Sequence, residues 1–179
     1  LSLKNSLAVL RKTNALLEGH FVLSSGLHSS VYIQCAKLLS YPHIASKICL
    51  SLSKQIKKKI KKIDLILSPA MGGIIIGYEI GKLLKKETIF CERVDGKFNL
   101  RRGFNIKKNA RVLIVEDVIT TGKSSLECSV VAEKEGAQIV GFASLIDRSN
   151  GKSKINKKIV SQIEIEIPTF TKDNIPEHL

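Results

Sequence analysis

VLIVEDVITTGKSS, residues 112–125, is the stretch that decides the fold class of this chain. Its first four residues are too apolar for an exposed strand and predict a buried one. Glu116 and Asp117 follow at once, and adjacent carboxylates at a strand end need a hydroxyl or cationic partner. Thr120, Thr121 and the residues after them predict a hydroxyl-rich turn into a helix. The segment therefore reads as one strand–loop–helix unit of an α/β protein.

The chemistry of this loop suits a sugar phosphate. Each carboxylate can accept from one hydroxyl of a vicinal diol, and the free N–H groups of a helix N-terminus favour a dianionic phosphate. Simple helix capping is the alternative, and it explains Ser124 but not the acidic pair. A nucleoside-triphosphate loop is excluded, because that motif needs glycine five positions before Gly122, where Asp117 stands.

The same alternation of strand and helix extends outward from this unit. Short apolar runs predict strands at 64–68, 88–92, 111–115 and 138–146, with helices at 74–85 and 124–135 between them. Such runs are typical of a parallel sheet covered by helices on both faces, with ligands at the carboxyl ends of the strands. Around this core we expect a helix within 3–17, two extended segments within 19–34, a helix at 41–60 and an edge strand at 158–167.

Residues 93–109, RVDGKFNLRRGFNIKKN, differ in composition from the rest of the chain, because they are rich in arginine and lysine. An Asp-Gly turn within basic residues predicts a projecting hairpin. A loop of this length in a compact domain is usually functional, although a solvated run of charge is the alternative.

Composition narrows the class of protein. A chain of 179 residues with 44% hydrophobic residues fits one domain with its own core. The net charge of +13 raises the possibility of nucleic-acid binding, but no aromatic platform accompanies the lysines and only six of the 29 basic residues are arginine. We therefore expect a lysine-rich surface that attracts anionic substrates and binds no nucleic acid.

Two further observations concern the cellular compartment in which the protein is expected. The four cysteines are far apart in sequence and form no C-x-x-C pair, so we expect a reducing, cytoplasmic setting with Cys49 and Cys128 as small core residues. No apolar run approaches the ~20 residues that span a bilayer, so we expect no membrane partner.

Residues 112–125 resemble the phosphoribosyl diphosphate motif of type I phosphoribosyltransferases, in which four apolar residues and two acids precede Thr-Thr-Gly. Glu followed by Asp is an allowed variant of the acidic pair. The resemblance implies the type I phosphoribosyltransferase fold, a parallel sheet flanked by helices with an N-terminal hood segment. By position it assigns phosphoribosyl diphosphate binding to Glu116, Asp117, Val118, Ile119, Thr120, Thr121, Gly122, Lys123 and Ser124.

Three more segments select a branch of this family. GHFVLSSGLHSSVYIQ (19–34), ERVDGKFNLRRGF (92–104) and LIDRSNG (145–151) together resemble bacterial orotate phosphoribosyltransferases. The resemblance implies transfer of a 5-phosphoribosyl group from 5-phosphoribosyl 1-diphosphate to orotate in pyrimidine synthesis, with Mg²⁺ held through the substrate. It also implies a homodimer with shared active sites, the basic hairpin closing over the neighbouring subunit's site.

The resemblance also assigns individual residues. Asp117, Arg93 and Lys97 are the expected catalytic residues, with Arg101 or Arg102 as alternative cations of the hairpin. Thr120 and Arg148 correspond to orotate contacts, and a guanidinium can bind the orotate carboxylate bidentately. For Arg148 the alternative is a salt bridge to Asp147 or to the C-terminal strand.

SPAMGG (68–73) resembles the diphosphate-binding loop, in which Ala70, Met71 and Gly72 would present backbone N–H groups. A close helix–strand contact at Gly72, Gly73 and Gly77 is an equal alternative from the residues alone.

The expected organisation is one phosphoribosyltransferase domain over 1–179. Residues 1–40 form the hood and base-binding part, 41–150 the core and 151–179 the C-terminal edge. The chain departs from the family pattern at Ser24, where many members carry Lys, and its hairpin is short and lacks the usual His. Two rival functions remain: a phosphoribosyltransferase for another base, and a regulatory protein that binds phosphoribosyl diphosphate or a nucleotide.

Overall fold

The computed structural model describes residues 1–23, 25–177 and 179, so Ser24 lies outside the described residues. Within these residues the helices are α1 (Leu3–Lys12), α2 (Cys35–Leu39), α3 (Pro42–Lys59), α4 (Gly72–Leu84) and α5 (Lys123–Lys134), with a 3-10 turn, η1, at Lys172–Asn174. The strands are β1 (Leu16–Val22), β2 (His28–Ile33), β3 (Leu65–Pro69), β4 (Glu87–Val94), β5 (Lys97–Leu100), β6 (Arg111–Ile119), β7 (Gln138–Asp147), β8 (Ile159–Glu164) and β9 (Thr169–Phe170).

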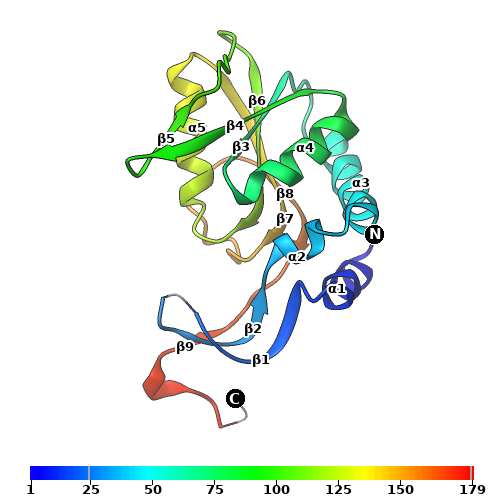
Figure 1. Cartoon of the computed structure of the whole chain (residues 1–179), viewed down its shortest axis with the longest axis vertical. Coiled ribbons are helices and arrows are strands. Elements are labelled where there is room, and N and C mark those ends of the chain that lie inside the picture. Colours follow the sequence, from blue (N-terminus) through cyan, green and yellow to red (C-terminus); the bar gives the residue numbers. More distant parts are fainter. Residues whose placement is uncertain (24, 178) are drawn as a thin grey trace.

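The larger sheet has the strand order β5-β4-β3-β6-β7-β8. Neighbouring strands are parallel except for β4 and β5, which form an antiparallel hairpin. Helices α3 and α4 cover one face of this sheet and α5 covers the other (Figure 1). The predicted parallel sheet flanked by helices is confirmed.

Alternate residues of the central strands belong to two separate hydrophobic clusters, one on each face of the sheet. Ile66 and Leu113 join the cluster built with α3 and α4, whereas Leu67 and Ile114 join the cluster built with α5. All four side chains are buried. This burial on both faces explains why the strands read as continuous apolar runs.

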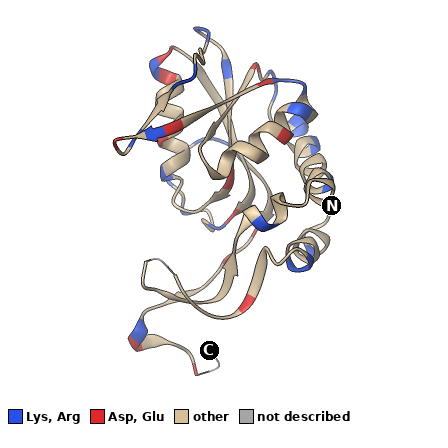
Figure 2. Ribbon diagram, in the orientation of Figure 1, with Lys and Arg blue, Asp and Glu red and all other residues tan. Residues whose placement is uncertain are grey.

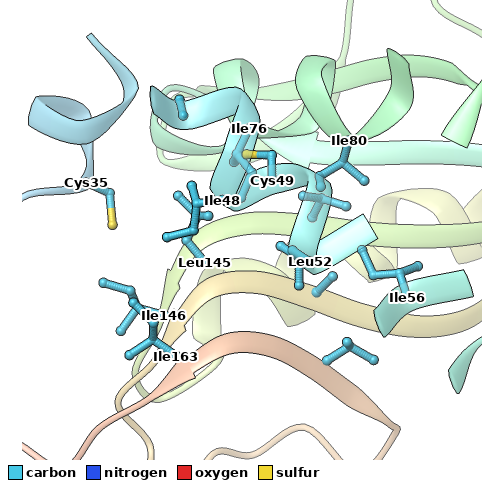
Figure 3. Close-up of a cluster of buried hydrophobic side chains, with 14 of the residues drawn as sticks. Cys35, Ile48, Cys49, Leu52, Ile56, Ile76, Ile80, Leu145, Ile146 and Ile163 are labelled. Carbon is cyan, nitrogen blue, oxygen red and sulfur yellow. The ribbon is translucent and has the colours of Figure 1, made fainter. Parts of the chain in front are cut away.

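The cysteines belong to these clusters. Cys49, on α3, lies beside Ile76 and Ile80 of α4 (Figure 3), and Cys128, on α5, belongs to the cluster on the other face of the sheet. Both are free and fully buried, so the prediction that they act as small core residues is confirmed.

Strand β6 is longer than the sequence predicted. The expected strand ended at Val115, but the ladder with β7 continues through Glu116 to the pair Ile119–Asp147. The acidic residues therefore lie on the strand rather than after it. Continued pairing with β7, which is itself ten residues long, outweighs the local preference for a turn.

The first helix is shorter than predicted. Its apolar period runs on to Leu17, but α1 ends at Lys12 and Leu16 already belongs to β1. Asn14 takes a left-handed conformation with φ of 55°, and the Ala15 N–H donates to Leu10 O at 2.8 Å. This αL ending is a common helix C-terminus, and periodicity alone does not reveal it.

The predictions for the edge strand at 158–167 and for the extended segments within 19–34 are confirmed in position. Strand β8 is an edge strand of the large sheet, as expected for residues 158–167. Its polar positions are buried rather than exposed, because Gln162 donates to Ser6 Oγ at 3.0 Å and the Ser161 and Ser144 hydroxyls lie 2.7 Å apart. Strands β1 and β2 form the two extended segments predicted within 19–34, and with β9 they make a small sheet beside the core (Figure 1).

Helix α4 lies close against the sheet because glycine faces it. A Cβ on Gly77 would collide with the Ser68 side chain, and one on Gly73 would lie 3.1 Å from Val115 O. At these two positions the glycines form the close helix–strand contact that the sequence left open.

Positive charge is spread over the helix surfaces and the hairpin (Figure 2). Lys57, Lys58 and Lys59 form the last turn of α3, where they complement the helix dipole. Among the described residues, none of the helices has the length and apolarity that a bilayer crossing requires.

Candidate active site

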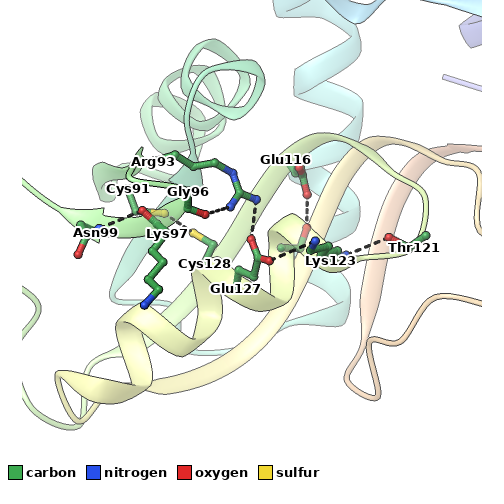
Figure 4. Close-up of polar contacts among 11 residues, drawn as sticks. Cys91, Arg93, Gly96, Lys97, Asn99, Glu116, Thr121, Lys123, Glu127 and Cys128 are labelled. Carbon is green, nitrogen blue, oxygen red and sulfur yellow. Dashed lines mark hydrogen bonds and ion pairs between the residues drawn. The ribbon is translucent and has the colours of Figure 1, made fainter. Parts of the chain in front are cut away.

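The site is organised around the carboxyl end of β6. Glu116 and Asp117 lie on this strand, partly buried, with side chains on opposite faces as strand geometry requires. The Ser125 hydroxyl, from the first turn of α5, donates to the Glu116 carboxylate (Figure 4). Asp117 Oδ1 accepts from the Val118 N–H at 2.9 Å. Both acids keep lone pairs for further donors.

Burial dominates the ionisation of the pair. It raises the pKa of Glu116 to about 7, with Asp117 adding repulsion, while the bond from Ser125 and the charge of Arg93 act in the opposite direction. Burial also raises the pKa of Asp117, opposed by backbone N–H donors. Two carboxylates that have lost part of their hydration will favour a ligand that supplies hydroxyl donors.

The loop after β6 leaves a helix N-terminus open. Gly122 is the N-cap of α5, in a left-handed conformation with φ of 79°, and the hydroxyl of the preceding Thr121 accepts from the Lys123 N–H at 3.3 Å (Figure 4). Ser124 lies inside the first turn, so the alternative that it serves as the N-cap is wrong. The Lys154 N–H donates to Thr121 O at 3.0 Å and Ile155 packs on Gly122, which holds the loop from the far side. The N–H groups of Ser124 and Ser125, which have no helical partner by position, are therefore available to an anion.

The turn between β3 and α4 faces the acidic pair. A Cβ on Gly72 would lie 2.8 Å from Asp117 Oδ2, so only glycine allows this approach. The Ala70–Met71 peptide bond is cis. One expectation is corrected here: the Ala70 N–H donates to Cys91 O at 2.8 Å and is not free for a ligand. Met71 and Gly72, at the start of α4, have N–H groups without helical partners by position.

Arg148 follows β7 and lies beside the end of β6. Its backbone N–H donates to Ile119 O at 2.8 Å, so it is adjacent to Thr120. Its Nε is buried and has no partner among the described residues, and burial lowers the pKa of its guanidinium. The alternative of a salt bridge to Asp147 or to the C-terminal strand is not supported, since no such ion pair occurs in the described part of the chain.

The basic segment forms the predicted hairpin, with β4 and β5 joined at Asp95 and Gly96. Arg93 donates to Glu127 of α5 at 2.5 Å, while Lys97 lies on the far strand and points away from Arg93 (Figure 4). Arg101 and Arg102 both pair with Glu92, at 3.1 and 2.8 Å.

These cations are exposed, but the three arginines form ion pairs with carboxylates of the same chain. The structure thus brings Arg93 towards Glu116, whereas Lys97 lies beside the hairpin turn and Arg101 and Arg102 pair with Glu92.

Sequence reasoning missed three residues of this site. Ser125 was included in the segment 112–125 but not as a partner of Glu116, Glu127 was not singled out, and Cys35 was considered only as one of four separated cysteines. Cys35 is fully buried at the start of α2, with its Sγ 4.0 Å from Asp117 O, and burial raises the pKa of its thiol. Contacts between segments so distant in sequence have no local pattern that reveals them.

A cavity of about 570 Å³ lies elsewhere, at the amino ends of β3 and β4. Its lining includes Asp64, Glu87 and Lys107 and none of the residues discussed above. Parallel sheets bind ligands at the opposite, carboxyl edge, so we place the site around Asp117 rather than in this cavity.

Comparison with known proteins identifies the family of this chain. A family model described as phosphoribosyl transferase domain matches residues 38–178, so phosphoribosyltransferases are the class that the fold and the site define. The chain is 46% identical over 174 residues to the orotate phosphoribosyltransferase of Erythrobacter litoralis, covering 97% of this chain and 90% of that protein. It is 51% identical over 141 residues to the orotate phosphoribosyltransferase of Helicobacter pylori, covering 79% and 70%.

The crystal structure of orotate phosphoribosyltransferase from Aeropyrum pernix superimposes with a TM-score of 0.72 at 26% identity, covering 88% of this chain and 92% of that one. The adenine phosphoribosyltransferase of Thermoanaerobacter pseudethanolicus shares the fold, with a TM-score of 0.62 at 18% identity over 75% of this chain and 88% of that one. The chain belongs to the orotate phosphoribosyltransferase family.

Proposed function

We propose that the protein transfers the 5-phosphoribosyl group of 5-phosphoribosyl 1-diphosphate to orotate, which yields orotidine 5′-phosphate and diphosphate. The observation that carries the proposal is the grouping of three features at one sheet edge. They are a desolvated acidic pair, a helix N-terminus with N–H groups left open by position, and an arginine whose buried Nε has no partner in the described part of the chain. The family relationship favours orotate over another base.

The ribose 5-phosphate half of the donor fits the loop after β6. Glu116 and Asp117 would accept hydrogen bonds from the vicinal hydroxyls, with Val118 and Ile119 continuing the strand beneath. The N–H groups and hydroxyls of 120–124 would bind the 5′-phosphate, favoured by the dipole of α5. The diphosphate would lie against Met71 and Gly72, which Asp117 already approaches.

Orotate would bind between Thr120 and Arg148. These residues are neighbours because Arg148 N–H bonds to Ile119 O. The guanidinium offers a planar fork to the carboxylate of orotate, and in a partly buried site such a charged hydrogen bond is strong. A buried donor without a partner in the free protein favours a ligand that supplies one.

The reaction requires little covalent catalysis by the protein. As the anomeric carbon–oxygen bond breaks, positive charge develops on the ribose ring and negative charge on the diphosphate. Glu116 and Asp117 would stabilise the ring, and Arg93 and Lys97 would neutralise the leaving group once the hairpin excludes water. Orotate is already an anion, so its attack on the anomeric carbon requires no strong general base.

Magnesium fits this site through the substrate. Among the described residues, no three His, Cys, Asp or Glu side chains are grouped closely enough to hold a metal by themselves. Diphosphate and ribose oxygens would be its main ligands, as Mg²⁺ commonly binds, with the acidic pair nearby. When bound, it neutralises charge on the leaving diphosphate.

A homodimer with shared sites is part of the proposal. Met71, Ile75 and Tyr78 are 84%, 56% and 68% exposed at the start of α4, at helical spacing and beside the diphosphate turn. An apolar stripe of this kind favours a protein partner, and a second copy there would bring its hairpin to this site. We expect Tyr78→Asp to shift the protein to monomers in analytical ultracentrifugation.

We also assign three parts to the single domain 1–179: the hood at 1–40, the core at 41–150 and the edge at 151–179. The proposed setting is the cytoplasm, with small-molecule substrates and no nucleic-acid partner.

The deciding experiment incubates the protein with Mg²⁺, phosphoribosyl diphosphate and orotate, and follows the loss of orotate absorbance. Parallel reactions replace orotate with adenine or hypoxanthine. Consumption of orotate alone supports the proposal. Turnover of another base, or binding of phosphoribosyl diphosphate with no turnover of any base, would identify one of the two rival functions instead.

A further inference from the structure

Glu127 connects the two cationic parts of the site. It lies one turn into α5, with its side chain about one-third exposed, and it accepts from Arg93 Nη2 at 2.5 Å. Its other oxygen lies 3.9 Å from Lys123 Nζ, in the loop proposed to bind the 5′-phosphate (Figure 4). One carboxylate thus pairs with both the hairpin arginine and the lysine at the start of α5 in the protein without substrate.

Arg93 is held in this position from several sides. Its Nη1 donates to Gly96 O at 2.8 Å and its guanidinium stacks 4.1 Å above the Phe98 ring. The side chain of Arg93 is still 39% exposed, so a change of rotamer or a small hairpin movement can free it. Arg93 is therefore held against α5 in a conformation from which it can be released.

We propose that Glu127 is a positioning residue: it holds Arg93 against α5 until the diphosphate group draws the arginine away. The inference rests on the proposed role of Arg93 at the leaving group. An N–H bond given to Glu127 cannot be given in full to a phosphate oxygen, so the two anions compete for the same donors. Phosphate bound at the loop also attracts Lys123 away from Glu127. Binding of phosphoribosyl diphosphate must therefore break or share the contacts of Glu127.

The test variant is Glu127→Gln, which removes the charge and keeps the shape. The matched control is Glu133→Gln, an exposed glutamate on the same helix. Release of one half-exposed ion pair is expected to lower the KM for phosphoribosyl diphosphate roughly two- to fivefold, with kcat unchanged. Glu133→Gln is expected to match the parent protein. A fall in kcat at constant KM for Glu127→Gln would overturn the inference, because Glu127 would then orient Arg93 for chemistry.

A readout independent of turnover is limited trypsin digestion of the hairpin at Arg101 and Arg102, which are 57% and 61% exposed. Without substrate, Glu127→Gln is expected to be cut faster than the parent and than Glu133→Gln, at an unchanged unfolding temperature. Equal cutting rates would contradict the holding role.

Combination with Arg93→Ala separates the two proposals. The effect of Glu127→Gln on KM and on cutting is expected to disappear in that background, and an effect that persists would overturn the inference. Should Arg93→Ala by itself leave kcat unaltered, the proposed role of Arg93 at the leaving group fails. The digestion assay would still decide whether Glu127 holds the hairpin.

Discussion

The backbone N–H of Arg148 donates to the carbonyl oxygen of Ile119 at 2.8 Å, across the ends of two neighbouring parallel strands. This bond brings the guanidinium that follows β7 next to the hydroxyl loop that follows β6. The proposed base site and the proposed ribose phosphate site are therefore adjacent through main-chain geometry.

Arg148→Ala is expected to raise the KM for orotate roughly ten- to a hundredfold, since a hydrogen bond to a charged group contributes about 1.5–3 kcal/mol. The KM for phosphoribosyl diphosphate is expected to change much less. Steady-state kinetics with each substrate varied in turn would measure both. Equal increases in the two constants would remove the carboxylate assignment.

Arg93→Ala is expected to lower kcat about a hundredfold, the usual size of one electrostatic contact made at the transition state. Lys107→Ala, an exposed lysine beyond the hairpin, serves as the control for loss of surface charge and is expected to retain kcat. If both variants lose activity equally, the general field of the basic surface matters rather than Arg93 itself.

Glu116 makes stability dependent on pH. Burial raises its pKa from 4.5 to about 7, so the folded state holds this proton more tightly than the unfolded state. Stability from this residue is therefore complete below pH 4.5 and declines as pH rises towards 7. Glu116→Gln, which cannot ionise, is expected to raise the unfolding temperature at pH 8 and to leave it little changed at pH 4.5. Thermal melts across this range would show it, and a gain that is equal at both pH values would contradict the burial effect.

Gly72→Ala is expected to reduce activity more than stability. The added Cβ would lie 2.8 Å from Asp117 Oδ2 and would displace this carboxylate from the diphosphate turn. Alanine otherwise suits the first residue of a helix. We expect a loss of kcat/KM with an unfolding temperature close to that of the parent. A variant with full activity would show that the approach of Asp117 to the turn has no role in the reaction.

Much of the core could be predicted because its signals are local. Four apolar residues before Glu116 predicted a buried strand, and the glycine and hydroxyls after it predicted an open helix start. The error in the length of β6 arose because the chain past Val115 is held by pairing with β7, which is not encoded in the segment itself. The misjudged end of α1 has a similar origin, since the left-handed turn at Asn14 interrupts a period that continues in the sequence.

The sequence by itself determined the α/β class, the acidic pair with the hydroxyl-rich loop after it, and the basic hairpin, because each depends on residues adjacent along the chain. Tertiary structure alone decided which distant groups meet: Arg148 with Thr120, Gly72 with Asp117, and Glu127 with Arg93. It also removed the Ala70 N–H from the donors, by pairing it with Cys91 O. These relationships depend on strand order and on the packing of α4 and α5, and a linear pattern carries neither.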